Sequence, residues 1–245
     1  MTTQNLEVIL VLSGTILIVF IKLSSTIFMS TTNNIVKRSR GRPKNEARRE
    51  EIIATASRLF GELGLKATTM EHIAKELGVS KLTLYSRFSD KDELFSAVIK
   101  NKCQQHIPEN FFADFEHLAV EESLFRVALA LLQLLTSEGE LKMERMLIGA
   151  DSKEQSQLTR LFYEAGPTQV KKMISNHLIM LDGRKQLCVP DPELSANIFA
   201  AMIKGSDIVL RAFMEVTPSA TQEQIETYCT AVVKSFIASH LSNDG

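Results

Sequence analysis

The chain has 245 residues, a length that suits one sizeable domain or two small ones. With 44% hydrophobic and 23% charged residues, its composition is sufficient to bury a core. The three cysteines lie far apart and lack the paired spacing of a metal site. We therefore expect reduced thiols, in a cytoplasmic setting, that act as small buried hydrophobic residues rather than as redox sensors.

Basic and acidic residues are distributed unevenly along the chain, although the net charge is only −1. From Lys37 to Lys102 there are 15 Lys and Arg against 9 Asp and Glu, a net charge of +6. From Cys103 to the end there are 12 against 19, a net charge of −7. The basic part suits neutralisation of phosphates, and the acidic part argues against a second nucleic-acid surface.

Residues 1–36 form an apolar N-terminal segment, with an uncharged run from Val8 to Ile21. This run is shorter than the ~20 residues that a membrane-spanning helix needs. A span over residues 8–28 is long enough if Lys22 lies near the membrane interface. The basic residues that follow would then keep the rest of the chain in the cytoplasm, anchored to the inner membrane.

Two other interpretations of this segment remain open. One places the true start of the protein at Met29, where a short polar lead precedes a basic arm. The other is a plain buried helix. A cleavable signal peptide is disfavoured because no Lys or Arg precedes the apolar run.

A dense basic arm, KRSRGRPK, occupies residues 37–44 ahead of the first predicted helix. Its glycine removes side-chain bulk and its proline disfavours helix, so the arm is slim and extended. Two guanidinium groups, those of Arg40 and Arg42, can therefore reach into a narrow, electronegative minor groove. Lys44 is also expected to bind DNA. The alternative is a solvated stretch of charge.

Two short helices joined by a tight turn are predicted between Thr68 and Phe88. Thr68 or Thr69 begins the first helix, and Gly78 ends it where the turn needs a positive φ. The Ser80 hydroxyl caps the second helix. This pattern is typical of a helix-turn-helix, which places its second helix in the DNA major groove. The alternative is a tight helical corner in an all-α protein.

Helices are also predicted on both sides of this stretch. Apolar residues at helical spacing from Ile52 to Leu63 indicate an amphipathic helix before it. A capped helix begins within Ser89–Leu94. The result is a three-helix domain with a fourth helix leading out, which favours the helix-turn-helix.

The run from Ala56 to Phe95 resembles the DNA-binding domain of the TetR/AcrR family of bacterial one-component regulators in its spacing, caps and aromatic positions. It departs from that family at Leu82, where a small residue is usual, and this bears on which bases are read. The resemblance implies phosphate contacts by Thr69, Tyr85, Arg87 and Lys91, and positions near base edges for Ser80, Lys81, Thr83 and Ser86. Thr68 is included among the expected DNA-binding residues.

Beyond Phe95 every predicted element is a helix, and no strand pattern of useful length is found. The expected helices cover residues 94–105, 121–136, 141–148, 155–165, 168–181, 192–216 and 221–240. The segments Leu161–Pro167 and Asp191–Gly205 resemble the C-terminal domain of the AefR-like branch of the same family.

Nothing in this part of the sequence predicts an enzyme, a cofactor or a metal site. It lacks a Gly-rich phosphate loop, an HExxH motif and a nucleophile elbow, and it has no paired carboxylates on a predicted common face. The five histidines are scattered, so we expect surface or satisfied core residues rather than ligands.

The apolar helix faces suggest two uses. Flexible, aromatic and single polar side chains could line a small-molecule pocket, with ordinary core as the alternative. The candidate pocket residues are Phe125, Met143, Met146, Phe162, Tyr163, Met173, His177 and Met202. Apolar stripes on the last two long helices suggest a dimer seam. These stripes are Ile198, Met202, Ile208 and Phe213, and Ile225, Val232, Val233, Phe236 and Ile237.

We therefore predict an all-α homodimeric regulator, with the apolar segment at 1–36, the arm and helix-turn-helix domain at 37–95, and a helical ligand-binding and dimerisation domain at 96–245. It is expected to bind a palindromic operator in double-stranded DNA in the cytoplasm, and to be a repressor that a small apolar ligand releases. The alternative is a structural DNA-binding protein tethered to the membrane through residues 8–28, without ligand control.

Overall fold

The structure is a computed structural model that describes residues 6–12, 15–21, 44–108, 110–148 and 153–241. The chain divides into two compact units, Met1–Gly41 and Arg42–Gly245. Each unit is described here by itself.

The described part of the first unit is a β-hairpin, not the helix that both a membrane span and a buried helix require. Strand β1 (Leu6–Leu12) pairs antiparallel with β2 (Thr15–Ile21), so that Leu6 lies opposite Ile21. Valine and isoleucine are frequent in both strands, and β-branched side chains favour the extended backbone. Strands are excluded by the sequence only beyond Phe95, so this hairpin lies outside that prediction. The remainder of the expected span, residues 22–28, lies outside the described residues. None of the helices in the described ranges is long and apolar enough to cross a membrane.

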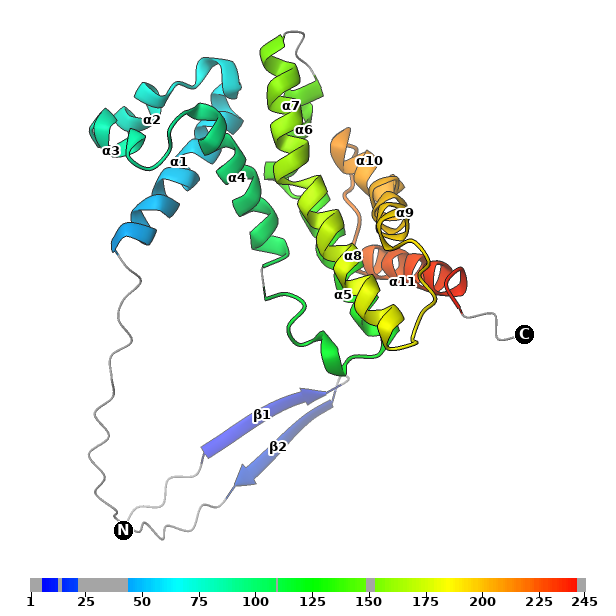
Figure 1. The fold of residues 1–245 in the computed structure, drawn as a ribbon. Helices are drawn as coiled ribbons and strands as arrows, with labels where there is room; N and C mark the ends of the chain where they lie inside the picture. The colour runs from blue at the N-terminus through cyan, green and yellow to red at the C-terminus, as the bar shows by residue number, and fades with distance from the viewer. Residues whose placement is uncertain (1–5, 13–14, 22–43, 109, 149–152, 242–245) are drawn as a thin grey trace, which may run out of the picture. The chain divides into compact units, whose positions relative to one another are not determined.

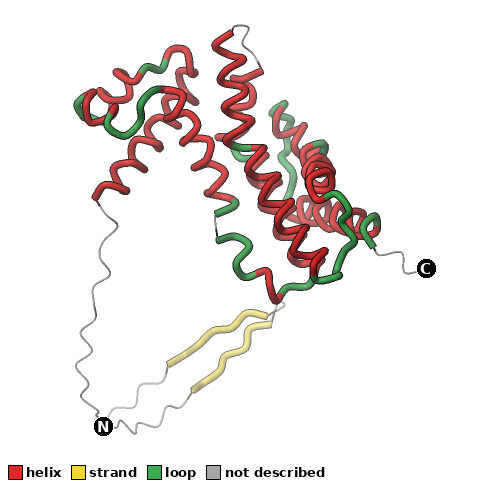
Figure 2. Tube along the Cα trace, viewed as in Figure 1, coloured by secondary structure: helices red, strands yellow, loops and turns green. Residues whose placement is uncertain are grey.

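The second unit is built from helices, which confirms the predicted all-α class (Figures 1 and 2). The helices are α1 (Lys44–Ala67), α2 (Met70–Glu76), α3 (Lys81–Tyr85), α4 (Lys91–His106), α5 (Val120–Leu135), α6 (Glu138–Ile148), α7 (Lys153–Ala165), α8 (Pro167–Gly183), α9 (Pro192–Lys204), α10 (Asp207–Phe213) and α11 (Gln222–Ala238), with a short 3₁₀ turn η1 (Phe115–His117) before α5.

Local hydrogen bonds set the starts of the helices around the predicted turn. The side chains of Thr69, Ser80 and Asp90 each accept a hydrogen bond from the backbone N–H three residues ahead, at the starts of α2, α3 and α4. Gly78, with φ of 63°, makes the turn between α2 and α3. The helix-turn-helix thus folds as its sequence predicts, because each signal acts within a few residues.

The helix expected over residues 192–216 is instead two helices. α9 ends at Lys204, and Ser206 caps α10 by accepting a hydrogen bond from the Val209 N–H at 3.2 Å. Gly205 occupies the break. A glycine followed by a capping serine is a local signal that one helix ends and the next begins. The prediction missed this signal because apolar residues continue at helical spacing across the break.

Buried apolar residues form two clusters in the second unit. The first, which we call the head core, contains residues of α1 to α4 together with Met143, Leu147, Leu158 and Phe162 from α6 and α7. The second, the C-terminal core, is built mainly from α5, α8, α9 and α11. Helix α4 runs from the helix-turn-helix to the rest of the unit (Figure 1). The boundary expected after Phe95 therefore falls inside α4, whose buried residues pack in the head core while the half-buried Cys103 packs against the C-terminal core.

Replacing Gly78 by alanine should destabilise the protein by about 1 kcal/mol, because a Cβ is strained at positive φ even though no atom lies within 4 Å of it. The matched control is Gly61→Ala within α1, where the space around the new Cβ is also open and φ is not positive. That change should stabilise by about 0.5–1 kcal/mol. Urea unfolding measures both, and equal effects of the same sign would contradict the assignment.

Candidate nucleic-acid interface and apolar cavity

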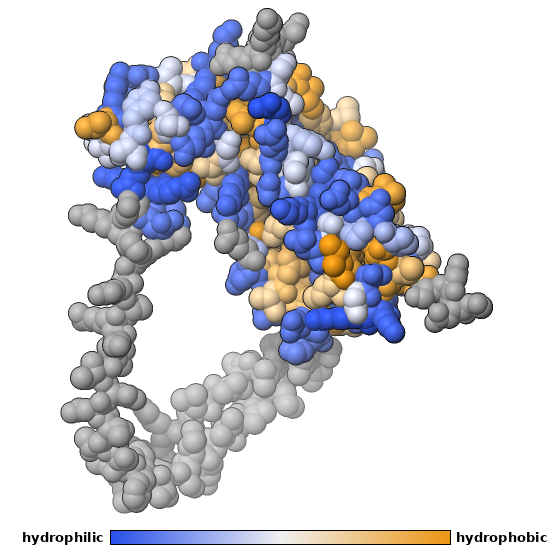
Figure 3. All heavy atoms as spheres, viewed as in Figure 1, coloured by the Kyte–Doolittle hydropathy of each residue, from blue (hydrophilic) through white to orange (hydrophobic). Residues whose placement is uncertain are grey.

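Helix α3 presents its outer face to solvent. Lys81, Leu82, Tyr85 and Ser86 are exposed there, and Leu84 is fully buried in the head core. The surface around α3 is mostly hydrophilic, with an apolar spot at its outer edge (Figure 3). A five-residue helix held at its start by a cap and at its inner face by a leucine is firmly placed for contact with a partner.

Lys81 is tied to the preceding helix. Its Nζ donates a hydrogen bond to Glu71 Oε1 at 3.0 Å, and this bond lowers the pKa of the Glu71 carboxyl. Both side chains are exposed, so the pair adds little to stability. The pair holds the Lys81 side chain against α2. A DNA phosphate or base that binds Lys81 must therefore displace the Glu71 carboxylate.

The hydroxyls of α3 are engaged in local hydrogen bonds. Ser80 Oγ accepts from the Thr83 N–H at 3.1 Å and lies 2.8 Å from Thr83 Oγ1. Ser86 Oγ donates to the Thr83 carbonyl at 2.9 Å. Because each hydroxyl has spare acceptor capacity, these bonds orient the groups without excluding an outside donor.

Thr68 is fully buried, so its predicted contact with DNA is wrong. Its Oγ1 lies 2.8 Å from the Gly64 carbonyl oxygen and 3.2 Å from that of Leu59, and it donates at the place where α1 kinks. The hydroxyl thus secures the end of α1. Thr69, the next residue, is exposed at the start of α2 and keeps its predicted position.

The remaining predicted DNA contacts lie around the same face. Tyr85 is exposed, and Arg87 is partly buried. Lys91 Nζ donates to the Leu65 carbonyl at 3.2 Å, which joins the start of α4 to the end of α1. Lys44 is the first residue of α1. Two further predicted contacts, Arg40 and Arg42, lie outside the described residues.

Leu82 stands out on α3 because its side chain is 81% exposed. A single exposed leucine is common on protein surfaces. This one, however, occupies the second residue of the helix that the turn projects outward. The sequence marked it only as a departure from the family pattern, and the structure shows how far it projects.

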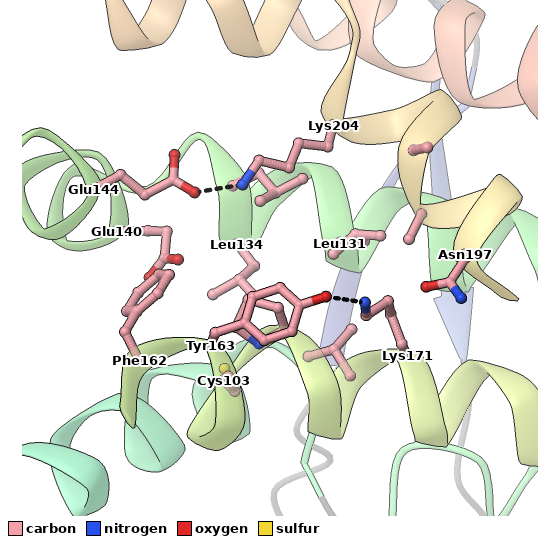
Figure 4. A pocket seen from close by; sticks show the side chains of 16 residues that line it. Cys103, Leu131, Leu134, Glu140, Glu144, Phe162, Tyr163, Lys171, Asn197 and Lys204 are labelled. Carbon is pink, nitrogen blue, oxygen red and sulfur yellow. Dashed lines mark hydrogen bonds and ion pairs between the residues drawn. The ribbon is translucent and has the colours of Figure 1, made fainter. Parts of the chain in front are cut away.

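A cavity of about 260 Å³ lies among α4 to α9 (Figure 4). Its walls are mainly apolar. The lining residues are Cys103, Leu131, Leu134, Leu135, Glu140, Glu144, Phe162, Tyr163, Gly166, Pro167, Val170, Lys171, Asn197, Ala200, Ala201 and Lys204. An apolar cavity with few polar groups is typical of small-molecule sites.

Two polar pairs border this cavity (Figure 4). Lys204 Nζ lies 2.7 Å from Glu144 Oε1. Lys171 Nζ donates to the Tyr163 hydroxyl at 2.6 Å, with its ammonium 4.8 Å from the centre of the tyrosine ring. The charge of Glu144 is thus compensated, and Lys171 is held by a neutral group.

Glu140 is the most unusual polar residue of the lining, because its side chain belongs to a residue only 6% exposed. Burial, and then the nearby carboxylate of Glu144, raise the pKa of its carboxyl to about 7, against the opposing effect of Lys102 and Lys204. Burial and the Glu140 charge likewise raise the pKa of the Cys103 thiol to about 12, so it is a neutral thiol. The cavity therefore contains a carboxyl group that keeps its proton to a higher pH than an ordinary glutamate.

Only two of the eight predicted pocket residues, Phe162 and Tyr163, line this cavity. The others pack elsewhere because sequence periodicity does not tell which helices face each other. Met143 and Met146 belong to the head core, and Phe125, Met173, His177 and Met202 lie in or against the C-terminal core. The residues that the prediction missed are mostly small or aliphatic, and Glu140 carried no local signal.

His177 is buried in an aromatic cluster and not in the cavity. Its ring centre lies 5.1 Å from that of Phe112 and 5.3 Å from that of Phe115, and its Nε2 lies 3.1 Å from Ser123 Oγ. Burial, and then the charge of Arg184, lower its pKa to about 4. His177 is therefore a neutral core residue, but its Nδ1 is buried without a hydrogen-bond partner, so it is not the satisfied core histidine that was expected.

The predicted dimer seam is partly wrong. Val232, Val233 and Phe236 are buried within the monomer, where α11 packs on α5. In contrast, Ile198 is 44% exposed and Leu194, one turn earlier on α9, is 54% exposed. Apolar patches are visible around α9 in Figure 3. The exposed stripe thus belongs to α9.

Among the described residues, no group of His, Cys, Asp and Glu is arranged to hold a metal ion.

The Glu140 carboxyl should make stability depend on pH. Between its usual pKa of 4.5 and its folded value of about 7, the folded state holds a proton that the unfolded state has released. Its contribution is therefore fully present below pH 4.5 and is lost as pH rises through 7, up to about 3 kcal/mol. His177 has the opposite slope, losing stability as pH falls from 6.5 to about 4.

The glutamine in Glu140→Gln is neutral at every pH. This variant should therefore remove the pH dependence due to Glu140 and keep the one due to His177. The difference in unfolding free energy between this variant and the wild type should grow as pH rises from 4.5 to 7, as measured by urea unfolding. A difference that does not change with pH would contradict the raised pKa.

Two protein-family models match the chain. Residues 52–98 match the bacterial regulatory proteins of the tetR family, and residues 122–240 match the C-terminal domain of AefR-like transcriptional repressors. Together these two ranges cover more than half of the 245 residues.

Individual proteins are similar to the chain over one or both parts. The HTH-type transcriptional regulator HbdR from Aromatoleum sp. (strain CIB) is 41% identical over 66 residues, which are 26% of this chain and 29% of that protein. The chain spans less than half the length of the first curated relatives it matches.

Solved structures match over more of the fold. A TetR-family transcriptional regulator from Mesorhizobium loti MAFF303099 is 27% identical with a TM-score of 0.67, and the flavonoid-responsive regulator FrrA is 28% identical with a TM-score of 0.63. Each match covers 81% of this chain and 99% of the other. With a capped helix-turn-helix at one end and an AefR-like helical domain at the other, the chain belongs to the TetR/AcrR family of transcriptional regulators.

Proposed function

We propose that this protein is a homodimeric transcriptional repressor that binds a palindromic operator and is released from it by a small apolar ligand. The observation that carries the DNA-binding role is the outward-facing α3, capped by Ser80 and fixed in the head core by Leu84. No observation on the described residues favours the alternative of a membrane-tethered protein.

In this proposal the first turn of α3 enters the major groove. Ser80, Lys81, Thr83 and Ser86 lie near base edges. The groups that hold phosphates are Thr69, Tyr85, Arg87 and Lys91. Arg40 and Arg42 of the basic arm reach the adjacent minor groove, and Lys44, at the start of α1, contacts the DNA beside them. The net charge of +6 from Lys37 to Lys102 supports the approach to DNA.

Leu82 adds an apolar contact to this set. The major groove offers one apolar group to a side chain, the C5-methyl of thymine. A leucine that is 81% exposed on the reading helix gains most by covering such a methyl group. We therefore place Leu82 against the methyl group of thymine. A leucine at a position where the family usually has a small residue would in this way change which bases are recognised.

Dimerisation is required because a palindromic site needs two recognition helices about one DNA turn apart, ~34 Å. The stripe of Leu194 and Ile198 on α9 supports a seam at that helix, since the monomer leaves both side chains exposed. Val232, Val233 and Phe236 are not part of this proposed dimer interface, because they are buried within the monomer.

Ligand control is supported by residues that the cavity and the head core share. Phe162 lines the cavity and also packs in the head core. Gly166, in the same wall, approaches α4 so closely that an added Cβ would lie 3.0 Å from Ile99 Cγ2. A ligand that displaces these groups would move α4, and with it the recognition helix. Such coupling typically amounts to ~1–3 kcal/mol, a roughly 5- to 150-fold loss of DNA affinity.

The Leu82 contact is tested with duplexes selected by the wild-type protein from a random pool. Replacing thymine by deoxyuridine removes only the methyl group and should weaken binding about fourfold at each contacted base. Leu82→Ala should abolish this difference, while Tyr85→Phe, at a phosphate position, should retain it. If the wild type binds both duplexes equally, Leu82 does not read thymine.

Ligand control is tested by reciprocity. A ligand found by thermal-shift screening should bind more weakly when operator DNA is present, by the same factor by which it weakens DNA binding. Calorimetric titration with and without DNA measures this factor. Identical ligand affinities in the two titrations would exclude ligand-controlled repression, and DNA binding itself would stand.

A further inference from the structure

We infer that the cavity takes an uncharged, mainly apolar molecule bearing a hydroxyl group, and that this hydroxyl donates a hydrogen bond to the Glu140 carboxyl. This ligand class deepens the ligand control proposed above and rests on it.

The first ground is that the Glu140 carboxyl lines the cavity without a hydrogen-bond partner of its own. The residue is only 6% exposed and lines the cavity. Within the part of the chain that the structure describes, the carboxyl makes no hydrogen bond, whereas the neighbouring Glu144 pairs with Lys204 at 2.7 Å. A ligand that fills the cavity takes away the access that these oxygens now have, and a ligand that donates a hydrogen bond offsets that cost.

The second ground is the charge around Glu140, which disfavours charged ligands. The groups that act on it are Glu144 on its own helix, Lys102 on α4 and Lys204 on α9, and the Cys103 thiol nearby is neutral. These two acidic and two basic groups largely balance one another, so a ligand ammonium or carboxylate would bring an uncompensated charge into a mainly apolar cavity. A hydroxyl adds no charge, and it can donate to the carboxylate or exchange hydrogen bonds with the carboxylic acid.

The third ground is the shape of the cavity. Glu140 and Phe162 lie at one end, and Lys171 and Asn197 lie at the other (Figure 4). Aliphatic side chains such as Leu131 line the space between them. The ligand is thus polar at its Glu140 end and apolar along its body. At about 260 Å³ the cavity is slightly below the ~300–1,000 Å³ usual for ligand pockets, so a small ring system is the appropriate probe.

The test compares three bicyclic probes that differ in one substituent: 2-naphthol, 2-methylnaphthalene and 2-methoxynaphthalene. The methyl compound matches the hydroxyl in size and has no polar atom, and the ether accepts but cannot donate a hydrogen bond. Calorimetry on the full-length protein should give about tenfold tighter binding of 2-naphthol than of 2-methylnaphthalene.

Variants of Glu140 test whether this side chain causes the preference for 2-naphthol. Glu140→Leu should bind the naphthol and the methyl compound equally, and Glu140→Gln, whose carbonyl still accepts, should keep part of the preference. The control is Glu164→Leu, which removes an exposed carboxylate of α7 that does not line the cavity, and it should keep the full preference. Circular dichroism shows whether each variant is folded.

A pH series gives an independent measurement. Once ionised, the Glu140 carboxylate only accepts hydrogen bonds, so the preference for 2-naphthol over the ether should grow as pH rises from 6 to 8. In Glu140→Gln the same preference should not change with pH.

Three outcomes count against the inference. Equal binding of 2-naphthol and 2-methylnaphthalene by the wild type would overturn the hydroxyl anchor, and ligand control by a purely apolar molecule would survive. A full preference in Glu140→Leu would place the anchor elsewhere. If none of the three probes binds, both the inference and the proposed use of this cavity fail, while operator binding is unaffected.

Discussion

The close packing of α4 against the joint between α7 and α8 is the contact on which the rest of the second unit depends. Gly166 makes it possible, because a Cβ at this position would lie 3.0 Å from Ile99 and 3.7 Å from the Cys103 sulfur. Phe162, one turn earlier, enters the head core from the other side of the same joint. The helix-turn-helix is therefore not an independent domain on a linker, and a displacement at the joint is carried into the head because packed cores do not deform smoothly.

The cavity lies beside this joint and contains a buried carboxyl whose surroundings disfavour its charge. Glu140 is buried next to a second carboxylate, with Lys102 held nearby by the Gly139 carbonyl at 2.7 Å. Burial and the Glu144 carboxylate raise the pKa of Glu140 to about 7, so the neutral, protonated form of this carboxyl is favoured. Perturbed pKa values of this kind are common at functional sites, and Phe162, which belongs to the head core, lines the same cavity.

On the DNA-binding face, the same side chains have two roles: they stabilise the helix-turn-helix and they point toward the DNA. Ser80 caps α3, and Lys81 pairs with Glu71 at 3.0 Å while its helix faces outward. These bonds are local and exposed, so they order the side chains at little net cost and can be exchanged for DNA. Leu82 is the exception, because it has no such bond and projects into solvent.

The sequence by itself determined the all-α class of the second unit, the helix-turn-helix and its caps, because Thr69, Gly78 and Ser80 act on backbone groups within three or four residues. The family resemblance followed from the same local spacing. Only the tertiary structure decided that Thr68 is buried and that Glu140 meets Phe162 in a cavity, because those environments are made by helices far apart in the chain. The apolar stripe of α11 likewise looks the same in sequence whether it packs on α5 or on a second subunit. Periodicity identifies an apolar face, and packing alone selects what covers it.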